Sequence, residues 1–361
     1  MTTQLLRKNV KYTVCRFVIL IIMVTLTGFA PVNGMGYGGG GHTPAGFNTP
    51  GNLLITDQFN NRVIEVDHQT NHIVWSFGSG NGTLCNPGPG AIIGPNDAER
   101  LSDGLTLIAG TGIPSGVPGT TACVDNRVIV VNQGGQIVWE YGQAGQTGNG
   151  TDLLNTPVFA LQLPNHDIMI VDQGNNRVIE VNKAKQIVWS YGPKSGPGAL
   201  NWPNSAELLP NGHILIADEN NNRTIEITPD GQIVWQCCQG LGAVAFASRL
   251  ASGNTLITDS GNSRIIEVTP TGQIVFQYYT NKGPNSNPNP LPTNAVFLQS
   301  GQIIIGDQMN NRAIIINQDG TIAYQYGRTN TAGSGSNQCY GPYTAYVIGD
   351  YYGQTPPPPT F

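Results

Sequence analysis

The chain has 361 residues and a formal net charge of −5, and only 11% of its residues are charged. It contains no block of like charge, which argues against a nucleic-acid partner and against a polybasic membrane-binding patch. Glycine (47 residues) and proline (25 residues) are abundant. Val, Ile and Leu recur in short runs between Gly, Asn and Pro clusters, a pattern typical of an all-β protein with many turns.

The first 34 residues differ from the rest of the chain. Basic residues at Arg7, Lys8, Lys11 and Arg16 precede an apolar run that extends from Phe17 to Ala30. This order predicts an export signal over residues 1–34. The run is shorter than the roughly 20 residues that span a bilayer, although an uncleaved N-terminal anchor is the alternative. We therefore expect an extracytoplasmic protein, secreted or periplasmic, with no other membrane contact.

Between a Gly-rich lead-in (35–50) and a Pro-rich tail that we expect to be disordered (351–361), residues 51–350 contain six copies of one unit. The fourth copy, Ala206 to Trp235, is the most regular. An arginine recurs in every copy: Arg62, Arg127, Arg177, Arg223, Arg264 and Arg312. An aspartate stands five residues before it in five copies: Asp57, Asp172, Asp218, Asp259 and Asp307. The second copy instead has Gly110, followed by an insertion, Thr111 to Ala122.

Each unit divides into four short apolar stretches, a to d, which are separated by turn residues. Sequences such as Pro-Asn-Gly and Pro-Asp-Gly are hairpin signals, and a repeated four-stranded antiparallel sheet is a propeller blade. The sequence thus predicts an all-β, six-bladed β-propeller. Because Ala345 to Gly349 fits the strand a pattern better than Ala45 to Asn48, we expect the C-terminal strand to close the ring within the first blade.

The repeat resembles a known family. The segment Asp259 to Arg264, with Ile-Ile-Glu-Val after it and Thr-Gly-Gln-Ile-Val closing the unit, is similar to the NHL repeat. The Gly-Gln-Ile-Val-Trp ending also resembles repeats of bacterial aryl-sulfate sulfotransferases. The resemblance covers residues 45–349 and implies the propeller fold. It says little of activity, because propellers host unrelated functions.

The regular polar and aromatic positions of the repeat have a structural interpretation. A carboxylate at the end of strand b accepts hydrogen bonds from the turn and pairs with the arginine that begins strand c. Since every blade needs this turn, its repetition indicates a scaffold. The aromatic side chains on strand d are expected to pack between blades: Trp75, Trp139, Trp189, Trp235, Phe276 and Tyr324.

The sequence has few of the features that known propeller enzymes use for catalysis. Sulfotransferases of propeller type are understood to use a histidine nucleophile in the channel, and amidating lyases of propeller type hold a metal with several histidines. No strand a carries a histidine here. His166 and His213 fall in the a–b turns of neighbouring blades, but no third ligand is evident. We therefore predict no metal or cofactor and a non-enzymatic binding or scaffolding role; the alternative is a propeller enzyme of the sulfotransferase or lyase type with a degenerate site.

Two regions are candidates for ligand contact. Polar side chains on strand a form either a channel lining for a small or anionic ligand or internal salt bridges: Glu99, Arg100, Gln162, Glu207 and Arg249. The b–c turns and the connectors between blades share one face and hold nearly all the irregular sequence. A protein or glycan partner is expected on this connector face, with Arg100 and Arg249 as anchors for an anionic ligand.

Five cysteines remain after cleavage of the signal, and an oxidising compartment favours their pairing. Cys85 lies in the connector that enters the second blade and Cys123 lies in the b–c turn of that blade. These loops emerge on one face, so we predict a Cys85–Cys123 disulfide. Cys237 and Cys238 are expected to form either a vicinal pair or separate bonds, one of them with Cys339.

Overall fold

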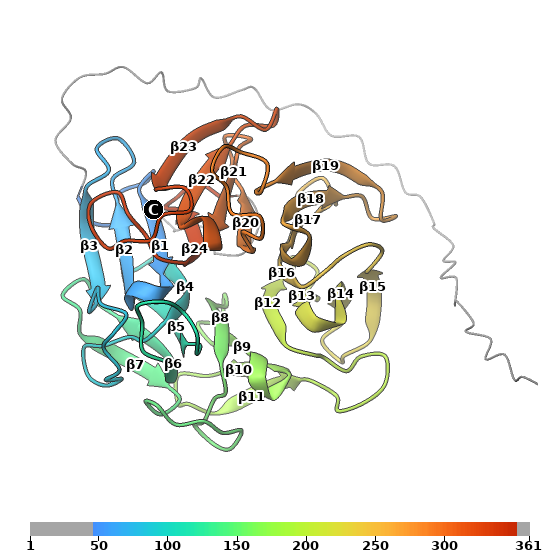
Figure 1. The fold of residues 1–361 in the computed structure, drawn as a ribbon. Helices are drawn as coiled ribbons and strands as arrows, with labels where there is room; N and C mark the ends of the chain where they lie inside the picture. The colour runs from blue at the N-terminus through green and yellow to red at the C-terminus, as the bar shows by residue number, and fades with distance from the viewer. Residues whose placement is uncertain (1–45, 352–361) are drawn as a thin grey trace, which may run out of the picture. The chain divides into compact units, whose positions relative to one another are not determined.

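The computed structural model describes residues 46–351 and shows six four-stranded antiparallel sheets arranged as a ring (Figure 1). The predicted all-β, six-bladed propeller is thereby confirmed. The predicted export signal (1–34), most of the Gly-rich lead-in and nearly all of the Pro-rich tail lie outside the described residues. Within residues 46–351, no helix is long and apolar enough to cross a membrane.

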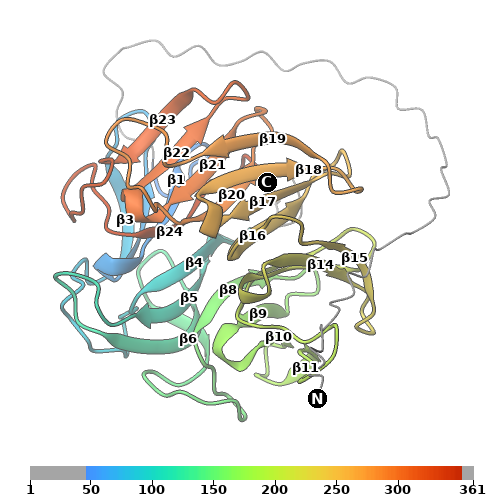
Figure 2. The ribbon, with the colours of Figure 1, turned by 45° about the vertical axis from the view of Figure 1, so that its right-hand side comes forward.

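Each blade contributes one strand to each of four concentric positions. From blade 1 to blade 6, the innermost strands a are β24 (Pro342–Val347), β4 (Pro95–Arg100), β8 (Pro157–Gln162), β12 (Pro203–Leu208), β16 (Val244–Arg249) and β20 (Pro292–Phe297). Strands b are β1 (Leu53–Asp57), β5 (Thr106–Ile113), β9 (Ile168–Asp172), β13 (Ile214–Asp218), β17 (Thr255–Asp259) and β21 (Ile303–Asp307). Figure 2 shows β4, β8 and β16 converging toward the middle of the ring.

The outer half of each blade follows the same order. Strands c are β2 (Arg62–Val66), β6 (Cys123–Val131), β10 (Arg177–Val181), β14 (Arg223–Ile227), β18 (Arg264–Val268) and β22 (Arg312–Ile316). Strands d are β3 (Ile73–Gly78), β7 (Ile137–Tyr141), β11 (Ile187–Tyr191), β15 (Ile233–Cys237), β19 (Ile274–Tyr279) and β23 (Ile322–Gly327). One-turn helices follow strand b in five blades: η1 (Gln58–Asn60), η2 (Gln173–Asn175), η3 (Glu219–Asn221), η4 (Ser260–Asn262) and η5 (Gln308–Asn310).

The chain ends share blade 1, as predicted. Strand β24 pairs with β1, so that Leu53 lies opposite Val347 and Ile55 opposite Ala345. The sheet order is β24-β1-β2-β3, and the red β24 lies beside the blue β1 in Figure 1. This pairing covers the inner edge of β1, which would otherwise expose unpaired backbone groups.

Apolar side chains on both faces of the sheets hold the blades together. Strands b are buried along their whole length because each blade packs between two neighbours, whereas the outermost strands d are partly exposed. The indole N–H groups on strands d donate to carbonyl oxygens in the c–d turn of the next blade. For example, the Trp75 Nε1 to Gln133 O distance is 2.9 Å. These aromatic residues therefore join blades, as the sequence predicted.

Candidate functional site

The aspartate that ends strand b is a buried structural junction. In all five regular blades, its Oδ2 atom accepts a hydrogen bond from the arginine Nε of strand c at 2.6 to 2.7 Å. The asparagine three residues after it also donates to its carboxylate. In four of these blades a connector N–H donates to the other oxygen. The carboxylate thus ties the turn to strand c in all five blades and also to the connector in four of them, whereas the second oxygen of Asp307 has no hydrogen-bond partner within residues 46–351.

A left-handed backbone and a side-chain hydrogen bond explain why asparagine precedes most of these arginines. Asn61, Asn126, Asn176, Asn222 and Asn311 all have a left-handed backbone, which asparagine tolerates better than most residues. Their Oδ1 atoms each accept the N–H of a residue in the connector that enters the next blade. The whole Asp/Asn/Arg set is therefore part of the scaffold.

Blade 2 forms the same junction with a carboxylate from a different position in the chain. Gly110 occupies the aspartate position, and Asp125 supplies the carboxylate from strand c, with Asp125 Oδ1 2.6 Å from Arg127 Nε. Its Oδ2 accepts the backbone N–H of Ile93 at 2.7 Å. A Cβ atom on Gly110 would lie 2.9 Å from Asp125 Cγ. Glycine leaves room there for the Asp125 carboxylate and for the Ile92 side chain, whose Cδ1 would lie 2.6 Å from the same Cβ atom.

Acidic side chains on strands a link neighbouring blades at the centre of the ring. The Oε2 atom of Glu99 accepts the backbone N–H of Gln162 at 2.9 Å. In the same way, the Oε2 atom of Glu207 accepts the N–H of Arg249 at 2.7 Å. The backbone N–H groups on the innermost strands lack a partner strand on that side, and these carboxylates satisfy them.

Asp97 and Glu99 of β4 form the most perturbed pair of carboxyl groups at the centre. Asp97 Oδ1 accepts the Tyr346 hydroxyl at 2.9 Å and Oδ2 accepts the Ala160 N–H at 3.2 Å. Burial raises the pKa of Asp97 to about 7 despite these bonds. Burial also raises the pKa of Glu99 well above its usual value, and the nearby Asp97 adds to the rise. The Oε1 atom of Glu99 has no hydrogen-bond partner within residues 46–351.

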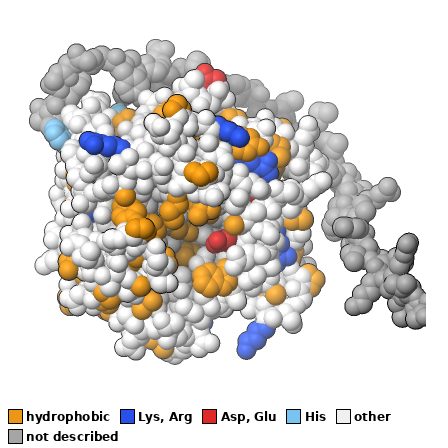
Figure 3. All heavy atoms as spheres, in the orientation of Figure 1, with side chains coloured by type: hydrophobic (Ala, Val, Ile, Leu, Met, Phe, Trp, Pro, Cys, Tyr) orange, Lys and Arg blue, Asp and Glu red, His pale blue; other side chains and the backbone are white. Residues whose placement is uncertain are grey.

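Buried aromatic side chains lie on the innermost strands as well. The Phe159 and Phe246 rings meet edge to face at 5.9 Å although they belong to blades 3 and 5, and both are buried, as is Tyr346. Figure 3 shows hydrophobic side chains gathered near the middle of one face, with Lys and Arg side chains nearer its edges. Asp97 and Glu99 are themselves only 1% and 2% exposed, so the two carboxyl groups lie in the packed interior of the ring.

Arg100 and Arg249 lie between blades. Arg100 Nη2 is 2.8 Å from Glu65 Oε2, and its guanidinium lies 3.9 Å from the centre of the Phe47 ring. Arg249 Nη2 is 2.9 Å from Glu226 Oε2 of blade 4. Because each guanidinium already faces a carboxylate, the expectation that these arginines anchor an anionic ligand at the channel gains no support from their geometry. Both arginines instead form internal salt bridges, which was the alternative interpretation of these strand a residues.

The insertion of blade 2 is held by the predicted disulfide. The Sγ atoms of Cys85 and Cys123 are 2.05 Å apart. Strands β5 and β6 extend beyond the usual hairpin, so that Ile113 pairs with Cys123. The base of the insertion packs in a cluster whose members come from blades 1, 2 and 6 and from their connectors: Phe59, Ile93, Ile113, Cys123, Val117, Met309 and Tyr340. The Tyr340 hydroxyl donates to Pro118 O at 2.7 Å.

The other three described cysteines are free, so the expected Cys237, Cys238 and Cys339 bonds were wrong. Cys237 ends β15 and is buried, whereas Cys238 is exposed. Successive side chains of an extended chain point to opposite faces, which separates the two sulfur atoms. Cys339 is fully buried in the connector before β24, and burial raises the pKa of its thiol well above the usual value.

The two turn histidines do not meet. His213 Nδ1 lies 2.7 Å from Glu226 Oε1, on the carboxylate that also faces Arg249. His166 is exposed and has a left-handed backbone. Across residues 46–351, no group of three or more His, Cys, Asp or Glu side chains is placed to hold a metal ion.

Comparison with known proteins supports the fold. No protein-family model matches the chain, and no curated protein sequence is significantly similar to it. A protein of unknown function from Bacteroides caccae is 15% identical with a TM-score of 0.56, over 77% of this chain and 93% of that chain. Virginiamycin B lyase from Staphylococcus aureus is 18% identical with a TM-score of 0.48, over 77% of this chain and 84% of that chain. At 15% identity, the similarity to the Bacteroides caccae protein concerns the fold and not the activity.

Proposed function

We propose that this chain is an exported, NHL-like propeller that acts as a non-enzymatic binding or scaffolding protein for a protein or glycan partner. The proposed contact surface is the connector face, centred on the insertion Thr111 to Ala122. The disulfide at the base of this insertion is typical of proteins that fold in an oxidising, extracytoplasmic compartment.

The single observation that carries the proposal is the way in which the insertion is presented. Its base is locked by the disulfide and by the apolar cluster around Phe59, whereas the tip residues Pro114, Ser115 and Gly116 are exposed. A loop that is ordered before binding loses less conformational entropy when a partner docks. The salt bridges of Arg100 and Arg249 also support the insertion over strand a as the contact surface, because each guanidinium already faces a carboxylate.

Photo-crosslinking tests this surface. A photoreactive amino acid replaces Ser115 at the tip, and in a control variant it replaces Ser252, which lies in the exposed a–b turn of blade 5. Both variants are expressed with the native export signal, irradiated in cells and analysed by gel shift and mass spectrometry. We expect a discrete adduct from position 115 and none from position 252. Equal labelling from both positions, or none from position 115, would contradict the proposal.

An enzyme of the sulfotransferase or lyase type is the second candidate. The observation in its favour is the Asp97 and Glu99 pair, whose raised pKa values are of the kind that acid–base catalysts use. The packed aromatic side chains around the pair count against it. Sulfate transfer from 4-nitrophenyl sulfate to a phenol, lost in Glu99→Gln and retained in Ser205→Ala, would favour this second function.

A further inference from the structure

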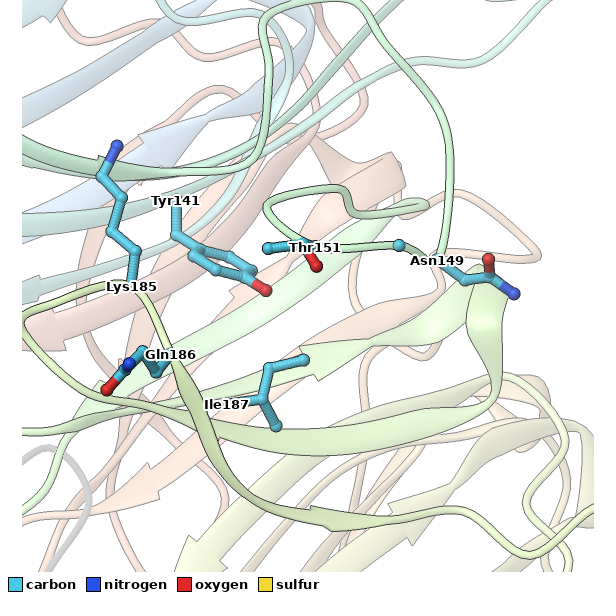
Figure 4. A pocket seen from close by; sticks show the side chains of 7 residues that line it. Tyr141, Asn149, Thr151, Lys185, Gln186 and Ile187 are labelled. Carbon is cyan, nitrogen blue, oxygen red and sulfur yellow. The ribbon is translucent and has the colours of Figure 1, made fainter.

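A surface hollow of about 510 Å³ lies between blades 2 and 3, at the outer edge of the ring. The Tyr141 hydroxyl in its wall is buried, and the ammonium group of Lys185 points away from the other lining side chains (Figure 4). Neither group is therefore placed to contact a molecule held in the hollow. A different polar cluster, at the centre of the connector face, leaves acceptor atoms open.

This cluster is a hydrogen-bond network that includes the residue after the strand b aspartate. In the regular blades that residue is Gln58, Gln173, Glu219, Ser260 or Gln308. Gln308 Nε2 donates to Gln58 Oε1 at 2.7 Å, which links blades 6 and 1. Asn204 Nδ2 of blade 4 lies 2.8 Å from the Tyr343 hydroxyl of blade 1. Because blades 1 and 4 are opposite each other in the ring (Figure 1), the network crosses its centre.

Glu219 is the acidic member of this set of equivalent residues, and no cation compensates its charge. Its Oε2 atom accepts Gln173 Nε2 at 3.0 Å and Asn204 Nδ2 at 2.7 Å. Burial raises the pKa of Glu219, and these two amide donors oppose the rise. The ion pairs within residues 46–351 all involve other carboxylates. Glu219 thus lacks the positive partner that the strand b aspartates have.

The amide donors determine which oxygen atoms of the cluster stay open. A carboxylate can only accept, so the Gln173 amide must present its nitrogen to Glu219 and turn its Oε1 atom elsewhere. Within residues 46–351, Gln173 Oε1 and Glu219 Oε1 accept no hydrogen bond, and neither atom is fully buried. Both open oxygens are acceptors, and one carries negative charge. They fit a positively charged donor, such as an ammonium or guanidinium group.

Trp202 lies beside this carboxylate in a conformation that bulky residues avoid. Its connector is held against η3, because the Asn220 N–H donates to Asn201 O at 3.0 Å. The residue before strand a has a left-handed backbone in every blade, and four of the six are small or medium-sized: Gly94, Thr156, Ala243 and Gly341. Trp202 and Leu291 are the other two. A left-handed backbone is costly for a large side chain, which points to a role outside the scaffold.

The indole ring of Trp202 also differs from the other indole rings of the protein. The other four tryptophans donate their indole N–H to a carbonyl oxygen of the next blade. The indole N–H of Trp202 has no partner within residues 46–351, and 44% of the residue is exposed. The face of an indole ring attracts positive charge. An exposed indole beside an uncompensated carboxylate therefore favours a cationic ligand.

We propose that Glu219, Gln173 and Trp202 form a binding site for one Lys or Arg side chain of the protein partner. Its cationic group donates to the open oxygens of Glu219 and Gln173, and the Trp202 ring covers its aliphatic stem. So few groups bind a free amine weakly, whereas a partner that also contacts the insertion adds further contacts on the same face. The inference rests on the proposed connector-face function and selects a protein over a glycan as the partner.

The test is a titration of the full exported chain, labelled with ¹⁵N, in which the indole N–H signals of the five tryptophans are followed by NMR. The probes are the N-acetyl N-methylamides of lysine and arginine, and the norleucine derivative is the neutral control. We expect a cationic probe to shift the Trp202 signal saturably at millimolar concentration and the norleucine probe to leave it in place. The signal missing from Trp202→Gly identifies it.

Three variants compare the site with the equivalent positions of other blades, with affinities measured from backbone amide shifts. Glu219→Gln introduces the residue of blades 1, 3 and 6, and should weaken the binding of the cationic probe about tenfold. Trp202→Gly introduces the residue of blades 1 and 2, and should weaken it about threefold. Leu291→Gly is the matched control, because it removes an exposed apolar side chain from the same position in blade 6. Its affinity should equal that of wild type.

Two results overturn the site: neither cationic probe shifts the Trp202 signal, or Glu219→Gln binds the probe as tightly as wild type. The assignment to the protein partner is overturned if Glu219→Gln leaves the yield of the adduct from position 115 unchanged. The proposed function fails separately. An adduct from position 115 without binding of the cationic probes removes only the site, whereas Glu219-dependent probe binding without such an adduct removes the connector-face function.

Discussion

Blade 2 and the five regular blades solve one structural problem with different residues. In the regular blades the carboxylate that binds the strand c arginine comes from the end of strand b. In blade 2 it comes from Asp125, two residues before Arg127, while Gly110 leaves room for it. The position of the carboxylate in space is kept although its place in the sequence has moved. This exchange lets the chain insert Thr111 to Ala122 without losing the junction.

The largest expected loss of stability comes from removing the carboxylate that pairs with the strand c arginine. It tests whether this carboxylate stabilises blade 2 as much as a regular blade. Asp125→Ala removes the buried carboxylate that contacts Arg127 and leaves this buried arginine only the half-exposed Glu140, whose Oε2 is 3.6 Å from Arg127 Nη1. Removing one member of a buried ion pair costs about 3–5 kcal/mol. Asp218→Ala in the regular blade 4 should cost a similar amount, measured by urea denaturation. A nearly neutral Asp125→Ala would show that Asp125 does not replace the missing aspartate.

A second contrast concerns strand a, where blade 2 has Asp97 and blade 4 has Ser205. The pKa of Asp97 rises from 3.8 to about 7 on folding, so the folded state binds this proton more tightly than the unfolded state. The associated stability is fully present below pH 3.8 and is lost as the pH rises through 7. Wild type loses this stability as the pH rises and Asp97→Asn does not. The unfolding free energy of Asp97→Asn minus that of wild type should therefore increase by up to about 4 kcal/mol from pH 4 to pH 8.

Denaturant titrations at several pH values measure this difference. Ser205→Ala is the control, because the serine does not titrate in this range and its effect should be the same at every pH. A constant difference between wild type and Asp97→Asn across the range would contradict the raised pKa of Asp97.

The disulfide makes a third distinction between blade 2 and the rest. Cys85 and Cys123 are separated by 38 residues, and closing such a loop restricts the unfolded chain. The double variant Cys85→Ser/Cys123→Ser should lose about 4 kcal/mol of stability and expose the insertion to limited proteolysis. Cys238→Ser, at an exposed free cysteine, should do neither. Unchanged protease resistance of the double variant would mean that the apolar cluster alone holds the insertion.

The smallest expected change in the free energy of unfolding concerns the tyrosines that end strands β7 and β11. Tyr191→Phe removes the hydrogen bond to Gly198 O and should cost about 1 kcal/mol. Tyr141→Phe removes a hydroxyl without a partner within residues 46–351, so the free energy of unfolding should stay constant or rise slightly. Thermal denaturation of both variants checks this. Equal losses would indicate that the Tyr141 hydroxyl is bound in the free protein.

The repeat, the ring closure and the Cys85–Cys123 bond were all predicted from the amino-acid sequence. The repeat depends on local spacing, because Gly- and Asn-containing turns define hairpins and alternation of apolar residues defines the strands. The disulfide followed from the repeat, because a propeller places blade connectors and b–c turns on one face. The fit of Ala345 to the strand a pattern was enough to place β24 beside β1. The order Asp125-Asn126-Arg127 also carried a signal for the displaced carboxylate, because it resembles the end of the regular turn.

The partners of the long side chains could not be predicted from the sequence. Arg100 and Arg249 stand on strand a, but the packing of adjacent blades sets their guanidinium groups against Glu65 and Glu226 of the preceding blade. Likewise, the path of one connector leaves the Tyr141 hydroxyl unpaired while another satisfies Tyr191. Such outcomes depend on contacts between segments far apart in the chain, and the period of a repeat carries no information about them.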